Sequence, residues 1–96
     1  SGVFFRPPAP NPTNASTVFR FSLKQPCRVE LSVYDARGRR TRALVDEPMA
    51  AGWQTVSWDG RDNDGHQVAS GTYYARLAVD EPTGQRVMSR SVVLLR

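Results

Sequence analysis

The sequence predicts an all-β protein, an antiparallel β-sandwich of six to seven short strands. Three observations lead to this expectation: apolar and polar residues alternate along most of the chain, turn residues recur at short intervals, and no stretch has a helical period. Short strands at regular spacing are typical of a sandwich, in which one face of each strand lies in the core. The 96 residues suit a single domain with one modest core.

Turn signals divide the chain into its expected strands. They are pairs such as Ala51-Gly52 and Ser70-Gly71, in which glycine permits a positive φ at no steric cost. The predicted strands are Thr17–Leu23, Arg28–Tyr34, Thr41–Val45, Trp53–Trp58, Thr72–Val79 and Gln85–Leu95, with a short extra strand near Val3–Phe5 as an option.

Alternation within the strands predicts which side chains lie in the core. In "TVFRFSL", Phe19 and Phe21 share the face opposite Arg20, and "RVELSVY" and "TYYARLAV" repeat this pattern. In "GWQTVSW", the two tryptophans fall on opposite faces. We expect Trp58 to be buried and Trp53 to lie on the outer face.

The first sixteen residues differ in composition from the rest. "RPPAPNPTNAS" contains four prolines and shows no alternation, which predicts an extended linker. Ser1-Gly2 has the composition of a scar left by cleavage of an expression tag. We therefore expect a linker over 1–16 that joins the sandwich, 17–96, to an N-terminal passenger domain in the same longer chain.

Charge and hydropathy argue against two kinds of partner. Arginine supplies 12 of the 13 basic residues, and four arginines crowd into "YDARGRRTRALVDE". No aromatic stacking platform interleaves this cluster, so we expect a solvated turn and no nucleic-acid partner. No apolar run approaches the roughly 20 residues of a membrane-spanning helix, so no membrane span is expected.

The stretch "WDGRDNDGHQV" concentrates candidate metal ligands, namely Asp59, Asp62 and Asp64. When Gly65 is aligned with the invariant glycine of an EF-hand loop, the first ligand position and the closing glutamate position both hold glycine. The same residues suit two consecutive tight turns, because Asp and Asn bond to nearby backbone amides. We expect an elaborate turn and no cofactor; calcium held in another geometry is the alternative.

The sequence offers no recognisable catalytic group. The sole histidine, His66, lies among turn residues with no serine or cysteine nucleophile at a recognisable spacing. Cys27 is the single cysteine, so it can form no intrachain disulfide. We expect no catalytic residues and a protein that is not an enzyme.

The order of the motifs resembles a known group of secreted bacterial domains. It runs through "PAPNPTNASTVFRFSL", "VELSVYDARGRRTRAL", "GWQTVSWDGRDNDGHQVASGTYYARL" and "SRSVVLLR", and the stretch from Trp58 to Leu77 is the most specific part. These motifs are similar to the type A C-terminal sorting domains of type IX secretion in Bacteroidetes. Such domains look like the immunoglobulin-like domain of the flagellar hook-capping protein, so the resemblance implies an immunoglobulin-like sandwich.

The resemblance also implies a function and its residues. In sorting domains the export signal resides in the last strands, which here contain Gly71, Tyr73, Arg90, Val92, Val93, Leu94, Leu95 and Arg96. The family often has a lysine in the terminal segment, where this chain has arginine, and the loop "RDNDGHQV" is closer to the hook-capping type. The implied module is exported through the periplasm and kept at the cell surface or secreted. Its implied partners are the secretion machinery and outer-membrane components.

Two other functions remain open from the sequence. A structural spacer or assembly module of the hook-capping type would share the fold but would not need its last strand for export. A ligand-binding accessory domain would hold carbohydrate on Tyr34 and Tyr74 or calcium at the aspartates. Single aromatic residues on strands are more often cross-strand packing partners than sugar platforms.

Overall fold

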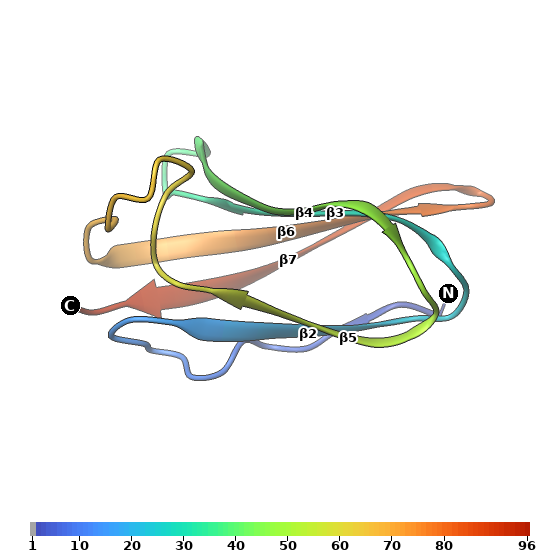
Figure 1. Ribbon diagram of the computed structural model, residues 1–96, viewed down its shortest axis with the longest axis horizontal. Helices are drawn as coiled ribbons and strands as arrows, with labels where there is room; N and C mark the ends of the chain where they lie inside the picture. Colours follow the sequence, from blue (N-terminus) through green and yellow to red (C-terminus); the bar gives the residue numbers. More distant parts are fainter. Residues whose placement is uncertain (1) are drawn as a thin grey trace.

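The computed structural model describes residues 2–96; Ser1, half of the expected cleavage scar, lies outside the described residues. Its strands are β1 (Phe4–Phe5), β2 (Thr17–Leu23), β3 (Cys27–Tyr34), β4 (Arg40–Met49), β5 (Gly52–Trp58), β6 (Gly71–Glu81) and β7 (Gly84–Leu94). They form two packed antiparallel sheets, with the strand orders β1-β2-β5 and β4-β3-β6-β7 (Figure 1). The predicted all-β, immunoglobulin-like sandwich is confirmed, and the described residues contain no helix able to cross a membrane.

The core is built from the alternate positions that the sequence predicts. From the smaller sheet, Phe19, Phe21 and Trp58 pack inward, and they face Leu31 and Leu77 of the larger sheet. All five side chains are fully buried. Burial of each aliphatic or phenylalanine side chain contributes about 1.5–3 kcal/mol, so these alternating positions hold the two sheets together.

The two tryptophans of β5 lie on opposite faces, as predicted. Trp58 is 0% exposed and Trp53 is 58% exposed. In the register of the smaller sheet, Trp53 lies beside Ser22, whose other neighbour is Phe4. The guanidinium of Arg6 lies 5.8 Å from the centre of the Trp53 ring, within reach of a cation–π contact.

Three strands of the larger sheet, β3, β4 and β6, are longer than predicted. β4 continues beyond Val45 to Met49, and Arg28 of β3 lies opposite Pro48. Proline normally interrupts a ladder, but β4 is an edge strand and can lose one donor on its free side. β6 likewise runs to Glu81, because its hairpin with β7 extends the pairing past the core.

The proline-rich segment lies along the sandwich, which differs from the linker expected over 1–16. Phe5 in β1 is buried and pairs with Phe21 of β2. Farther along, Thr17 Oγ1 donates a hydrogen bond of 2.8 Å to the carbonyl oxygen of Pro10. Thr13 forms a parallel bridge with Leu94 of β7. The prolines keep this segment extended, and its polar groups find partners on both sheets.

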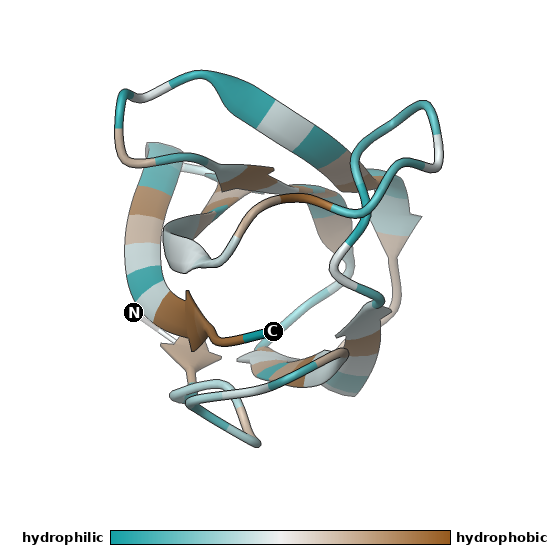
Figure 2. Ribbon diagram, turned by 90° about the vertical axis from the view of Figure 1, so that its left-hand side faces the viewer, coloured by the Kyte–Doolittle hydropathy of each residue, from teal (hydrophilic) through white to brown (hydrophobic). Residues whose placement is uncertain are grey.

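Several loops gather at one end of the molecule. The connections 9–16, 35–39 and 59–70 lie there together with the C-terminus (Figure 1). Seen from this end, the loops are mostly hydrophilic, while the sheets behind them carry the hydrophobic positions (Figure 2). The candidate ligands and the end of the last strand therefore share one end of the sandwich.

Candidate functional site

The aspartate loop, residues 59–70, crosses from β5 of the smaller sheet to β6 of the larger sheet. Gly60 and Gly65 have φ values of +73° and +85°, which glycine adopts without steric cost, and they give the loop its sharp turns. A Cβ atom at Gly60 would lie 2.6 Å from the carbonyl oxygen of Ala15. The glycine therefore also permits close contact between the loop and the N-terminal segment.

The aspartate side chains form the turns of this loop. Asp62 Oδ1 accepts hydrogen bonds from the backbone N–H groups of Asp64 (3.0 Å) and His66 (2.9 Å). Asp59 Oδ1 accepts one from the N–H of Arg61 at 3.1 Å. Backbone hydrogen bonds, chiefly the one from His66, hold the pKa of Asp62 below its ordinary value because they stabilise the carboxylate.

Asn63 joins the loop to the edge of β4. Its Oδ1 accepts a hydrogen bond of 2.9 Å from the N–H of Ala43, and its own N–H donates to the carbonyl oxygen of Thr41 at 3.1 Å. These bonds cover the first part of a strand edge that would otherwise present unpaired groups to another chain. Sequence reasoning missed this role, because an asparagine between two aspartates suggested only another turn residue.

The core holds the loop from below through two aromatic side chains. Trp58 Nε1 donates to the carbonyl oxygen of Arg61 at 3.0 Å, and the Tyr73 hydroxyl donates to that of Ala69 at 2.7 Å. The two rings meet edge-on with their centroids 5.4 Å apart. Burial raises the pKa of Tyr73, so its hydroxyl stays protonated and can donate.

Arg96 ties the end of the chain to the same loop. Its Nη2 donates to the carbonyl oxygen of Gly60 at 2.6 Å and its Nε to that of Val68 at 2.8 Å. Its backbone N–H donates to Ser70 Oγ at 2.9 Å. Arginine suits this position because its planar group carries several donors in a fixed arrangement.

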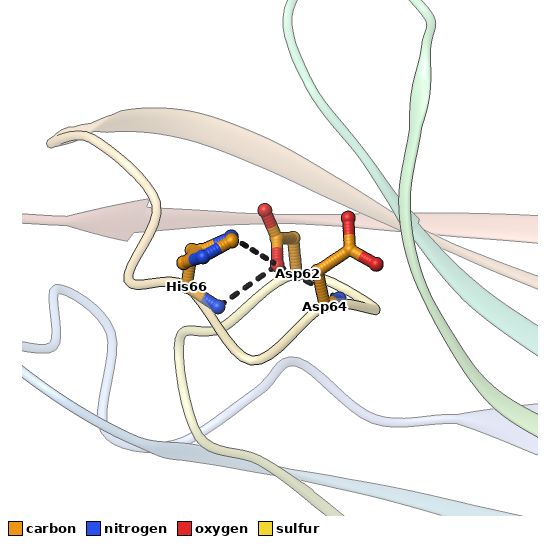
Figure 3. A group of neighbouring side chains, drawn as sticks. All are labelled: Asp62, Asp64 and His66. Carbon is orange, nitrogen blue, oxygen red and sulfur yellow. Dashed lines mark hydrogen bonds and ion pairs between the residues drawn. The ribbon is translucent and has the colours of Figure 1, made fainter.

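The loop brings together only part of the predicted metal-ligand set. Asp62 lies between Asp64 and His66 (Figure 3), and one ligand atom of each lies within 4.8 Å of the others. Asp59 lies outside this group and forms an ion pair with Arg42 at 3.0 Å. Calcium prefers about six to eight oxygen ligands, whereas this group offers two carboxylates and an imidazole. Because Asp62 Oδ1 already accepts two backbone hydrogen bonds, the donor set suits a turn better than a calcium site.

The candidate signal residues of β6 and β7 face one another across a ladder. Gly71 is opposite Leu94, and Tyr73 is opposite Val92. The side chains of Tyr73, Val92 and Leu94 are buried and form part of the core. Replacing any of these three would therefore disturb folding as well as any signal.

The remaining candidates lie nearer the surface. Leu95 is 55% exposed, Val93 is half-buried, and Arg96 contacts the aspartate loop as described above. Arg90 reaches from β7 to β1, where its Nε donates to the carbonyl oxygen of Phe5 at 2.8 Å. A partner of the folded domain could touch these residues without unfolding it.

A second set of residues missed from the sequence lies beside β7, in a stretch that we call the N-terminal cover, residues 11–13. The Asn11 side chain takes the place of a peptide group: its Nδ2 donates to the carbonyl oxygen of Ser91 at 3.2 Å, and its Oδ1 accepts from the N–H of Val93 at 2.9 Å. Thr13 then pairs through its backbone, donating to Val93 at 2.9 Å and accepting from Leu95 at 2.8 Å. The only signal in the sequence was the two polar residues that flank Pro12.

The other residues singled out from the sequence are dispersed. Tyr34 and Tyr74, named as carbohydrate candidates, are cross-strand neighbours on β3 and β6, and Tyr74 is partly exposed. Cys27 begins β3 at the end opposite the aspartate loop, so it lies far from His66 (Figure 1). The structure therefore does not place the cysteine and the histidine next to each other as a catalytic pair would be.

The sequence of this chain is similar to that of a flagellar protein. A family model described as the FlgD Ig-like domain matches residues 11–83. The basal-body rod modification protein FlgD of Salmonella typhimurium is 37% identical over 60 residues, which are 62% of this chain and 26% of that protein. The chain thus spans about a quarter of the length of the curated relatives that it matches.

Solved structures with a similar fold include flagellar and secretion proteins. PorU of Porphyromonas gingivalis has a TM-score of 0.76 at 22% identity, over 99% of this chain and 10% of that chain. FlgD of Xanthomonas campestris, which takes part in hook capping, has a TM-score of 0.67 at 21% identity, over 96% and 68% of the two chains. PorZ of P. gingivalis, an essential surface component of the type IX secretion system, has a TM-score of 0.57 at 22% identity, over 99% and 12%. At these identities the likeness shows a shared fold.

Proposed function

Because this chain belongs to the family of FlgD Ig-like domains, we propose that it is a non-catalytic module of a larger secreted bacterial protein, which it directs across the outer membrane and keeps at the cell surface. The observation that carries this proposal is the likeness to PorU, which extends over 99% of this chain and so includes the ladder between β6 and β7. PorU and PorZ are both far longer than the part that this chain matches. This supports a role for the matched part as one module of a larger protein.

A second function is favoured by the sequence relatives. The identity of 37% over 60 residues is to FlgD, which supports an assembly module of the hook-capping type. Such a module would act through its surfaces in a protein assembly, and export would not depend on its last strand. The two functions therefore differ in what they require of the residues after Arg90.

A fusion experiment tests the export function directly. Residues 2–96 are placed behind a periplasmic reporter in a host that has the type IX machinery and in a mutant that lacks it. We expect the reporter in the medium or on the cell surface of the first strain and in the periplasm of the second. Retention in the periplasm of both strains would contradict the proposal.

Point variants separate export from folding. Deletion of residues 92–96 would remove two core side chains, so the sharper change is Leu95→Ser, at an exposed position of the terminal segment. Its matched control is Trp53→Ser, at a similarly exposed apolar position on the other sheet. We expect both variants to melt close to the parent temperature and only Leu95→Ser to reduce export. Equal export of both variants would favour the assembly module.

A further inference from the structure

We propose that the edge of β7 at residues 85–89 is a docking site for an extended acidic peptide, which joins the larger sheet as an additional strand. Strand addition of this kind uses backbone hydrogen bonds for affinity and alternate side chains for specificity. This site does not depend on the proposed export function, because it would serve an assembly module equally well.

The direction of the backbone groups on β7 follows from the N-terminal cover. The cover bonds to Ser91, Val93 and Leu95, so odd-numbered residues point their backbone groups away from β6. The register between β6 and β7 runs without a shift along the whole hairpin. Because antiparallel strands alternate strictly, Val87 and Ser89 present their N–H and C=O groups to the same free side.

The cover ends before it reaches these residues. The Arg90 side chain donates to the carbonyl oxygen of Phe5. Between Arg90 and the turn that joins β6 to β7, no hydrogen bond from the described residues reaches the outer side of Val87 or Ser89. An open groove of about 560 Å³ lies between β1 and the part of this stretch at Met88 and Ser89, and Pro7 also lines it. An added strand would find unpaired backbone groups and room for its side chains there.

The other edge of the larger sheet is protected differently. Asn63 covers the start of β4, and Pro48 removes a backbone donor near its end. Both are devices by which proteins prevent a strand edge from pairing with another chain. Residues 85–89 contain no proline and receive no such cover.

Charge indicates the chemistry of the partner. Arg76 lies opposite Ser89, and Arg86 lies within the open stretch. Arg90 directly follows this stretch, and Arg6 lines the groove. None of the ion pairs found within residues 2–96 involves these four arginines. A second copy of this chain, with its net charge of +4, would be repelled, whereas an anionic strand would be attracted.

A titration followed by NMR tests the site. The probe is a seven-residue peptide that alternates glutamate and valine, and its counterpart alternates lysine and valine. We expect the glutamate peptide to shift the amide signals of residues 85–89 and the lysine peptide to leave them unchanged. Shifts confined to the arginine-rich hairpin at 35–39, or equal shifts with both peptides, would overturn the proposal.

Two variants locate the binding on the edge. Val87→Pro removes one outward N–H group and leaves the ladder to β6 intact, so we expect about tenfold weaker binding with the fold preserved in a thermal melt. Arg86→Glu should also weaken binding about tenfold, whereas Arg37→Glu, the same charge change on the distant hairpin, should not. Undiminished binding by Arg86→Glu would contradict the proposal even if Val87→Pro failed to fold. Amide shifts at 85–89 that depend on protein concentration alone would mean that a second copy occupies the edge, and would also overturn it.

Discussion

The ring of Trp58 meets the ring of Tyr73 edge-on, with 5.4 Å between their centroids, and both side chains donate a hydrogen bond to the aspartate loop. At this end of the hydrophobic core, the indole nitrogen of Trp58 and the hydroxyl of Tyr73 hold the loop in place through these two hydrogen bonds. Aromatic pairs in this geometry add about 0.5–1.5 kcal/mol to the effect of burial alone. The core and the hydrogen bonds of the loop's own turns therefore both hold the loop in position.

Substitutions of Trp58 should separate the contribution of its buried ring from that of its hydrogen bond to the loop. We expect Trp58→Ala to reduce the free energy of unfolding by about 3–5 kcal/mol, because it leaves a cavity in the core. Trp58→Phe keeps an aromatic ring but loses the donor to Arg61, and should cost less than Trp58→Ala. Urea unfolding measures both values. A loss below about 1 kcal/mol for Trp58→Ala would contradict the observed burial.

The double variant Asp62→Asn, Asp64→Asn should keep the fold. An amide oxygen still accepts the backbone hydrogen bonds that form the turn, and asparagine suits the same conformations. We expect circular dichroism spectra like those of the parent, with calcium and with a chelator. A melting temperature that rises with calcium in the parent but not in the double variant would show a metal site instead.

The single variant Asp62→Asn should reveal a pH dependence. The folded-state pKa of Asp62 lies below its ordinary value of 3.8, so its charge stabilises the fold above that pH and the effect is lost as pH falls through the folded pKa. We expect the parent to melt above the variant at pH 7, with a gap that narrows below pH 3.8. Thermal melts across this range measure the gap, and a gap that widens in acid would refute the assignment.

Asn11 should stabilise the protein from outside the predicted domain. Asn11→Ala removes both hydrogen bonds to β7 and should cost about 1–2 kcal/mol, with faster hydrogen exchange at the Val93 amide. Asn11→Asp is the matched control: it keeps the acceptor for Val93 but loses the donor to Ser91, so its cost should be intermediate. Equal stability of all three proteins would mean that the Asn11 side chain contributes nothing to the stability of the fold.

Features set by neighbouring residues could be predicted from the sequence. The burial of Phe19 and Phe21 and the opposite faces of Trp53 and Trp58 follow from alternation, which is a property of any strand. The turn chemistry of Asp62 is equally local, since its partners lie two and four residues away. The fold class and the interpretation of the loop rest on such short-range patterns.

Features that depend on distant partners could not be predicted. β4 passes through Pro48 because β3 pairs with it there, and Asp59 leaves the group around Asp62 because Arg42 binds it from another strand. Asn11 contacts residues about 80 positions away in the chain. Proline content alone suggested a linker, because no local pattern shows that β7 has a free edge for this segment to cover.

The N-terminal cover has a mechanical consequence. The two ends of the described chain lie at opposite ends of a molecule 39 Å long (Figure 1), and the cover runs parallel to β7 at Thr13 and Leu94. Tension between the two ends therefore pulls these segments lengthwise past each other, so the hydrogen bonds of Asn11 and Thr13 share the load instead of opening one after another.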